Sequence, residues 1–99
     1  MLILAGSIRL PADRLDDARP TMERMIAASR AEPGCLGYSF AADLLEPGLI
    51  RIFEMFTDEE ALRAHSESAH MQEWRDAWEA LGIGERQITL YGISRVEER

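Results

Sequence analysis

The chain has 99 residues, of which 46% are hydrophobic and 29% are charged. This length fits one domain, and the composition is that of a folded globular protein rather than a disordered one. Eighteen acidic residues against eleven basic ones give a net charge of -7, which argues against a nucleic-acid partner because such binding depends on neutralising phosphates. We therefore expect one domain over residues 1–99 with no nucleic-acid partner.

Membrane, disulfide and metal classes are also disfavoured. No apolar run approaches the roughly 20 residues of a membrane-spanning helix, and residues 1–6 lack a basic segment or a cleavage site, so we expect a cytoplasmic protein with no membrane partner. The single Cys35 cannot form an internal disulfide, and with two histidines it cannot complete a four-ligand zinc site. The chain has no Lys and no Asn, which excludes Schiff-base lysine chemistry. We expect neither a metal nor a cofactor.

The first third of the chain predicts a strand followed by a helix. Residues 2–10 alternate with a period of two, and the even positions are the more apolar. After Pro11, Asp13 is the predicted cap of a helix that runs to about Glu32. Pro20 lies inside this pattern and predicts a kink or a later start. The apolar positions at helical spacing are Leu15, Ala18, Met22, Met25, Ile26 and Ser29.

The middle of the chain predicts a hairpin. The sequence Glu-Pro-Gly at residues 32–34 ends the first helix, because proline disfavours helical geometry in the residue before it. Strands are predicted over residues 36–42 and 49–56, with a second Glu-Pro-Gly turn at residues 46–48 between them. The two strands should therefore pair.

The last part predicts a second helix and a final strand. Residues 57–60 form a capping box with Thr57 at the N-cap and Glu60 three residues later. The polar sequence at residues 65–68 predicts that the helix breaks near Ser66 and restarts. Gly82 and Gly84 end it, and residues 87–96 supply the final strand.

The order β-α-β-β-α-β predicts an α+β, ferredoxin-like fold with a four-stranded antiparallel sheet and two helices on one face. The other face of the sheet then lacks a cover. Candidates for the side chains on that face include Ile3, Ala5, Phe53 and Met55. A symmetric dimer that packs sheet on sheet would bury that face.

Two segments resemble a known family. Residues 32–38 read Glu-Pro-Gly-Cys-Leu-Gly-Tyr after an amphipathic helix. Residues 53–70 contain the strand glutamate Glu54, an acidic helix start with Ala61 and Leu62, and two histidines five residues apart. Over nearly the whole chain this pattern resembles the antibiotic biosynthesis monooxygenase domain. The resemblance implies a dimeric α+β barrel with a ligand cleft between the sheet and the helices of each subunit.

The family includes quinol and anthrone monooxygenases, heme-degrading enzymes and isomerase-like members. Heme-degrading relatives rely on an asparagine in the first strand, where this chain offers only Ser7. Heme breakdown is therefore disfavoured. Relatives often carry tryptophan after the strand glutamate, where this chain has Phe56, so no role is assigned to that position.

Three residues are the candidate catalytic groups. His65 matches the first family histidine and faces the sheet side of its helix, so it can serve as a general base; the alternative is a helix-end histidine bonded to a backbone carbonyl. Glu54 interrupts an apolar strand, where burial raises a carboxyl pKa unless Arg51 or another cation pairs with it; it is either a base or a structural brace. Tyr38 can orient a substrate carbonyl through its hydroxyl, or be an ordinary strand tyrosine.

Four further residues are candidate substrate contacts: Trp74, His70, Tyr91 and Phe53. Trp74 lies one helical turn before Trp78, and the two can form an aromatic stripe that stacks on a flat ring, although such stripes usually belong to the core. His70 lies four residues before Trp74 and shares a face with His65 only if the helix breaks. Tyr91 offers a second phenol, and Phe53 lies in the segment that carries the resemblance.

The resemblance implies a cofactor-independent monooxygenase that oxidises a small electron-rich aromatic, such as a quinol or an anthrone, with dioxygen. His65 is the expected base, Tyr38 or Tyr91 the orienting donor, and Trp74 the stacking wall. The expected partners are a second copy of the chain, the aromatic substrate and dioxygen. The alternatives are a non-catalytic dimeric ligand-binding module and an isomerase-like member that moves a proton without oxygen.

Overall fold

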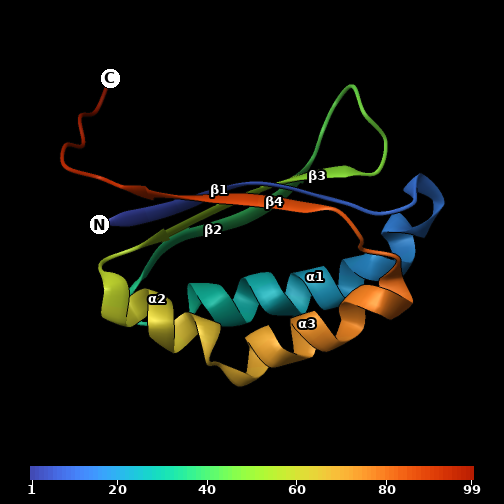
Figure 1. The fold of residues 1–99 in the computed structure, drawn as a ribbon, viewed down its shortest axis with the longest axis horizontal. Coiled ribbons are helices and arrows are strands. Elements are labelled where there is room, and N and C mark those ends of the chain that lie inside the picture. The colour runs from blue at the N-terminus through green and yellow to red at the C-terminus, as the bar shows by residue number, and fades with distance from the viewer.

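The computed structural model describes residues 1–99 and has two layers, a four-stranded antiparallel sheet and three helices packed on one face of it (Figure 1). The predicted α+β, ferredoxin-like fold is confirmed. In chain order the elements are β1 (Leu2–Arg9), the 3-10 helix η1 (Ala12–Arg14), α1 (Leu15–Arg30), β2 (Cys35–Ala42), β3 (Leu49–Phe56), α2 (Glu59–Ser66), α3 (Ala69–Leu81) and β4 (Arg86–Gly92).

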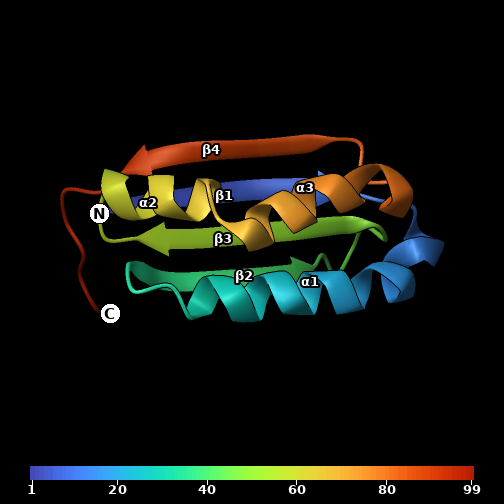
Figure 2. The same ribbon diagram turned by 90° about the horizontal axis from the view of Figure 1, so that it is seen from below.

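The strand order in the sheet is β2-β3-β1-β4, and every neighbouring pair is antiparallel. Figure 2 looks onto the helical layer, with α1 running along β2 and with α2 and α3 in front of β1 and β3. The predicted hairpin is confirmed, since β2 and β3 pair directly. None of the three α-helices combines the length and the apolar composition of a membrane span.

The core lies between the sheet and the helices. On β3 the alternate residues Ile50, Ile52 and Phe56 point into it and are almost completely buried. Met22 and Met25 of α1 meet them from the helical layer. The period-two pattern of the strands and the helical spacing of α1 therefore converge on one apolar layer, as amphipathic elements require.

Two details at the start of α1 correct the sequence prediction. Asp13 does not cap the helix: it lies in η1, and Arg14 occupies the N-cap without a side-chain hydrogen bond. The helix begins at Leu15, so the later start expected from Pro20 is wrong. Pro20 removes only one backbone donor, and the burial of Ala18 and Met22 on either side of it offsets that loss.

The predicted break in the second helical region is confirmed and positions the site. Asp58, rather than Thr57, caps α2 by accepting a hydrogen bond from the Ala61 N–H at 2.8 Å. Ser68 caps α3, accepting from the Met71 N–H at 3.2 Å. His65 thus lies in the last turn of α2, and the second histidine of the chain lies in the first turn of α3.

The final strand is shorter than predicted. It ends at Gly92, which is paired with Leu2 at the start of β1. Beyond that point β1 offers no further partner, so the predicted continuation to Val96 has no ladder to join.

The face of the sheet opposite the helices is apolar at one end and uncovered. Ile3 is paired with both Met55 and Tyr91 across the sheet, and Ala5 is paired with Phe53. Phe53 is 40% exposed and Tyr91 is 49% exposed. The expectation that helices do not reach this face is confirmed.

Candidate functional site

A cavity of about 380 Å³ lies between the sheet and the helices α2 and α3. Ten of its 14 lining residues are hydrophobic, so it suits a largely apolar ligand. Its polar lining side chains come from β2, β3, β4 and α2. The lining residues are Leu4, Ile8, Tyr38, Phe40, Ile52, Glu54, Leu62, His65, Ser66, Met71, Trp74, Trp78, Arg86 and Ile88.

His65 connects this cavity to a polar cluster behind it. The side chain is almost completely buried, and its two ring nitrogens face different carboxylates. Nδ1 lies 2.8 Å from Oε2 of Glu32, within hydrogen-bond distance, whereas Nε2 lies 3.5 Å from Oε1 of Glu54. The backbone carbonyl expected as the alternative partner of the ring is not used; a carboxylate takes its place.

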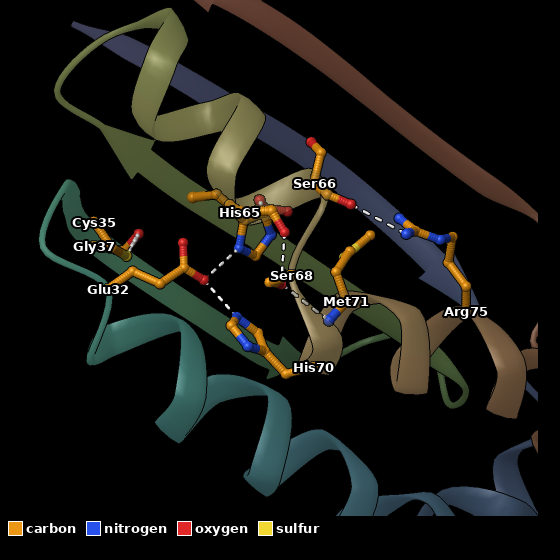
Figure 3. A network of polar contacts seen from close by, with 10 residues as sticks. Glu32, Cys35, Gly37, His65, Ser66, Ser68, His70, Met71 and Arg75 are labelled. Carbon is orange, nitrogen blue, oxygen red and sulfur yellow. Dashed lines mark hydrogen bonds and ion pairs between the residues drawn. The ribbon is translucent and has the colours of Figure 1, made fainter.

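Glu32 joins the two histidines. Its Oε2 atom also lies 2.5 Å from Nε2 of His70, so one carboxylate oxygen is shared by two imidazoles (Figure 3). The three side chains come from separate segments: the turn after α1, the end of α2 and the start of α3. The break between the helices allows this meeting, because His65 and His70 would lie on different faces of one continuous helix.

Burial makes Glu54 an unusual carboxyl group. Loss of solvation, reinforced by the negative charge of Glu32, raises the pKa of Glu54 to about 7. Arg51 does not relieve this cost, because it points to the other side of the strand and pairs with Asp43 at 3.3 Å. Glu54 can therefore hold or release a proton near neutral pH, which suits acid–base work.

Tyr38 is the third polar group of the cavity and stays a neutral phenol. Its side chain is almost fully buried, and its ring centroid lies 5.4 Å from that of His65. Burial, together with the negative charge of Glu54, raises the pKa of Tyr38 well above its ordinary value. The hydroxyl can donate a hydrogen bond at any physiological pH.

Aromatic side chains form one wall. Trp74 lies 5.4 Å from Phe40 and 6.3 Å from Trp78, between ring centroids. The guanidinium carbon of Arg86 lies 4.0 Å above the Trp78 ring, a cation–π arrangement. The indole Nε1 of Trp78 is buried without a protein hydrogen-bond partner.

The structure brings together four of the seven residues proposed from the sequence. His65, Glu54, Tyr38 and Trp74 line one cavity. His70 lies behind His65, in contact with Glu32 rather than with the cavity. Phe53 and Tyr91 do not line the cavity either, because they belong to the opposite face of the sheet.

Sequence analysis missed the roles of Glu32 and Arg86. Glu32 was assigned only to the helix-ending turn, although it opens the first segment of the family pattern. Its partners lie 33 and 38 residues away, a distance that no local periodicity reports. Arg86, at the start of β4, is the only arginine that lines the cavity.

Comparisons with known proteins agree with the geometry. The family model for antibiotic biosynthesis monooxygenases matches residues 1–77. A candidate antibiotic biosynthesis monooxygenase from Deinococcus radiodurans is 26% identical and superposes with a TM-score of 0.92, covering 100% of this chain and 98% of its own. One from Nitrosomonas europaea, 21% identical with a TM-score of 0.85, covers 96% of this chain and 100% of its own and supports the fold.

An uncharacterized protein of Synechocystis sp. is 27% identical over 96 residues, which make up 97% of this chain. The chain spans 65% of the length of that relative.

Proposed function

The chain belongs to the antibiotic biosynthesis monooxygenase family, and from this premise we propose that it is a cofactor-independent monooxygenase. The proposed substrate is a small electron-rich aromatic, such as a quinol or an anthrone, and the oxidant is dioxygen. One observation carries the proposal: Nε2 of His65 lies at an apolar cavity beside Tyr38 and Glu54, while Glu32 holds the other ring nitrogen.

Glu32 prepares His65 to act as a base. A carboxylate can only accept a hydrogen bond, so Nδ1 carries the proton and the lone pair lies on Nε2. When Nε2 takes a proton from the substrate, the resulting imidazolium is stabilised by the adjacent Glu32 carboxylate. The 3.5 Å separation between Nε2 and Glu54 leaves Nε2 free to accept the proton of a bound phenol or activated CH group.

The oxygen step then needs little from the protein. The deprotonated substrate transfers one electron to dioxygen, and the substrate radical and superoxide combine into a carbon–oxygen bond. With an anthrone, the hydroperoxide at the former CH₂ carbon loses its remaining hydrogen as a proton, breaks its O–O bond and gives the ketone and one water. The protein excludes water, holds the geometry and returns protons through His65 and Glu54.

The walls of the cavity fit a flat ring with polar edges. Trp74 and Phe40 provide aromatic surface on which the ring can stack. Tyr38 can donate a hydrogen bond to a substrate oxygen, and the buried Nε1 of Trp78 offers a second donor. Arg86 adds a positive charge that favours the ionised phenol over the neutral one.

We further propose that the chain works as a homodimer through the uncovered sheet face. Phe53 and Tyr91 are exposed beside Ile3 and Met55, and an apolar patch of this kind is unfavourable in water. A symmetric partner presents the same patch and covers it without leaving a second apolar face open.

Oxygen uptake tests the proposal. The wild-type protein, treated with a chelator, is mixed with a panel of quinols and anthrones, and His65→Ala is measured beside it. We expect uptake that survives chelation and falls by about 100-fold or more in the variant, the range of a lost general base. Glu79→Gln, an exposed change on α3, is the matched control and should leave uptake unchanged.

Other results would favour the alternatives. Absence of uptake with every substrate, together with a ligand-dependent rise in the thermal midpoint, would indicate a binding module. Exchange of a substrate C–H with solvent, dependent on His65 and independent of oxygen, would indicate an isomerase; a near-neutral Glu54 beside His65 supports this second candidate.

A further inference from the structure

We propose that Glu32, His65 and His70 form a binding site for a divalent transition-metal ion of the Zn²⁺ type. The site lies on the side of His65 that faces away from the cavity, so it is distinct from the proposed substrate site. It does not depend on the proposed oxygenase activity.

The geometry of the three donors supports the site. One ligand atom from each residue lies within 4.8 Å of the others. Nδ1 of His65 and Nε2 of His70 both point at the same carboxylate oxygen of Glu32, as Figure 3 shows. A bound ion would replace the two ring protons between these atoms, with metal–ligand distances of about 2.0–2.2 Å after small side-chain shifts.

The donor types select the class of ion. Two imidazoles and one carboxylate are a common ligand set of zinc and other transition-metal sites that leave a position open for water. A closed structural zinc site needs four protein ligands, and the small number of cysteines and histidines in the chain excludes a site of that kind. The proposed site has three protein ligands and an open position. The Glu32 carboxylate has no arginine partner, and its side-chain contacts are the two histidines. An ion would therefore meet a negative charge that no fixed cation neutralises.

The surroundings supply a second, independent indication. In metal sites a ligating histidine usually donates its other ring N–H to a carboxylate, which fixes the orientation of the ring. Here Nε2 of His65 lies 3.5 Å from Oε1 of Glu54. The buried glutamate is thus placed where such an outer partner belongs.

Solvent and charge give an ion a path to the site. An open hollow of about 340 Å³ beside Glu32 is also lined by the acidic residues Asp58 and Glu60. A second hollow of about 210 Å³ reaches His70 from the other side. A cleft of one charge sign concentrates ions of the opposite sign, so the first hollow favours entry of a cation, and either hollow leaves room for a coordinated water.

Metal binding would change what His65 presents to the cavity. Coordination at Nδ1 moves the single ring proton of a neutral imidazole to Nε2. The cavity then faces an N–H donor instead of a lone pair, so the metal-bound protein lacks the base. The same side chain thereby links occupancy of the metal site to the state of the cavity.

Equilibrium dialysis with Zn²⁺ tests the site on untagged, chelator-treated protein in the absence of substrate. We expect one saturable ion per chain. Glu32→Gln and His70→Gln should each weaken binding by at least about 10- to 100-fold, the cost of losing even an outer-shell partner. Glu60→Gln lines the acidic hollow without donating a ligand, so it should weaken binding far less. Unchanged affinity in both ligand variants, or no saturable binding at micromolar zinc, would overturn the proposal.

A second measurement avoids reliance on variants that fail to fold. Long-range ¹⁵N–¹H spectra of the imidazoles in the wild-type protein report which nitrogens carry a proton or a metal. Zinc should move the His65 Nδ1 and His70 Nε2 signals together, at one ion per chain, and leave a protonated Nε2 on His65. Coordination through other nitrogens, or no change in either ring, would refute the site. Because neither experiment uses substrate, failure here leaves the oxygenase proposal standing, and the reverse is also true.

Discussion

The two faces of the sheet differ although they share every strand. Along β3, Ile52 is 5% exposed beneath the helices, whereas its neighbour Phe53 is 40% exposed on the opposite face. Both side chains are large and apolar, so the difference lies in the cover and not in the residue type. One face is covered by the chain's own helices, and the other is open.

The faces also differ in where the chain places its buried polar groups. The helix-covered side holds Glu54, Tyr38 and His65 together, although burial of a carboxyl and an imidazole costs free energy. The apolar end of the open face, around Ile3 and Phe53, carries no charged side chain. A fold that needed only stability would place apolar residues at the covered positions too, so the comparison supports a functional reason for the buried cluster.

The largest effect is expected from placing one charge on each face of β3. Ile52→Asp buries an unpaired carboxylate in the core and should lower the free energy of unfolding by about 3–5 kcal/mol. Phe53→Asp should leave the fold intact but weaken dimerisation by about 100-fold or more, because the same charge then faces a partner's apolar surface. Urea denaturation measures the first effect and light scattering during size-exclusion chromatography the second.

The pair of variants distinguishes fold from assembly. If Phe53→Asp remained dimeric at the wild-type concentration, the open face would not be the interface. If Ile52→Asp unfolded no more readily than Phe53→Asp, the assignment of the two faces would be wrong.

A smaller effect is expected from pH, and it belongs to the covered face alone. Glu54 has a pKa of about 7 in the folded chain against an ordinary value of 4.5. Between these values the folded state keeps a proton that the unfolded state has lost, so the stability from Glu54 is present below about pH 4.5 and declines as pH rises towards 7. The total loss is about 3 kcal/mol. Glu54→Gln lacks the titrating carboxyl group. The free energy of unfolding of this variant, compared with that of wild type, should therefore increase as pH rises from about 4.5 to 7.

Denaturation at a fixed protein concentration with chelator present measures this slope and keeps both dimerisation and metal binding constant. The exposed Glu79→Gln should retain the wild-type slope. Parallel curves for wild type and Glu54→Gln would mean that the carboxyl titrates as it does in water.

The sequence predicted the elements better than the contacts between them. The bounds of β3 and the break after Ser66 are as expected, because alternation and polar helix-breaking residues act locally. The cap of α2 was misplaced because Thr57 and Asp58 are both good capping residues. The choice between them depends on where the chain leaves β3, which the local sequence does not determine.

The site was predictable only in part. Residues that the family pattern names, such as His65 and Glu54, do line the cavity. Glu32 was missed because its role arises when the turn after α1 meets two helices far along the chain. Phe53 was expected both on the uncovered face and as a substrate contact, and the structure confirms only the first, because a side chain on that face cannot reach the cavity beneath the helices.

The smallest predicted effect compares one phenol on each face. Tyr38→Phe removes a hydroxyl from the cavity and keeps the ring, so kcat should fall by about 10-fold, the value of one hydrogen bond of about 1–1.5 kcal/mol. KM should change little if the bond forms mainly in the transition state. Tyr91→Phe makes the same chemical change on the open face and should leave kcat unchanged. Steady-state oxygen uptake at saturating substrate measures both variants. Equal losses in the two would place Tyr91 in the catalytic site after all, while no loss in Tyr38→Phe would remove the Tyr38 hydroxyl from the mechanism and leave the orientation of the substrate to the other polar groups of the cavity.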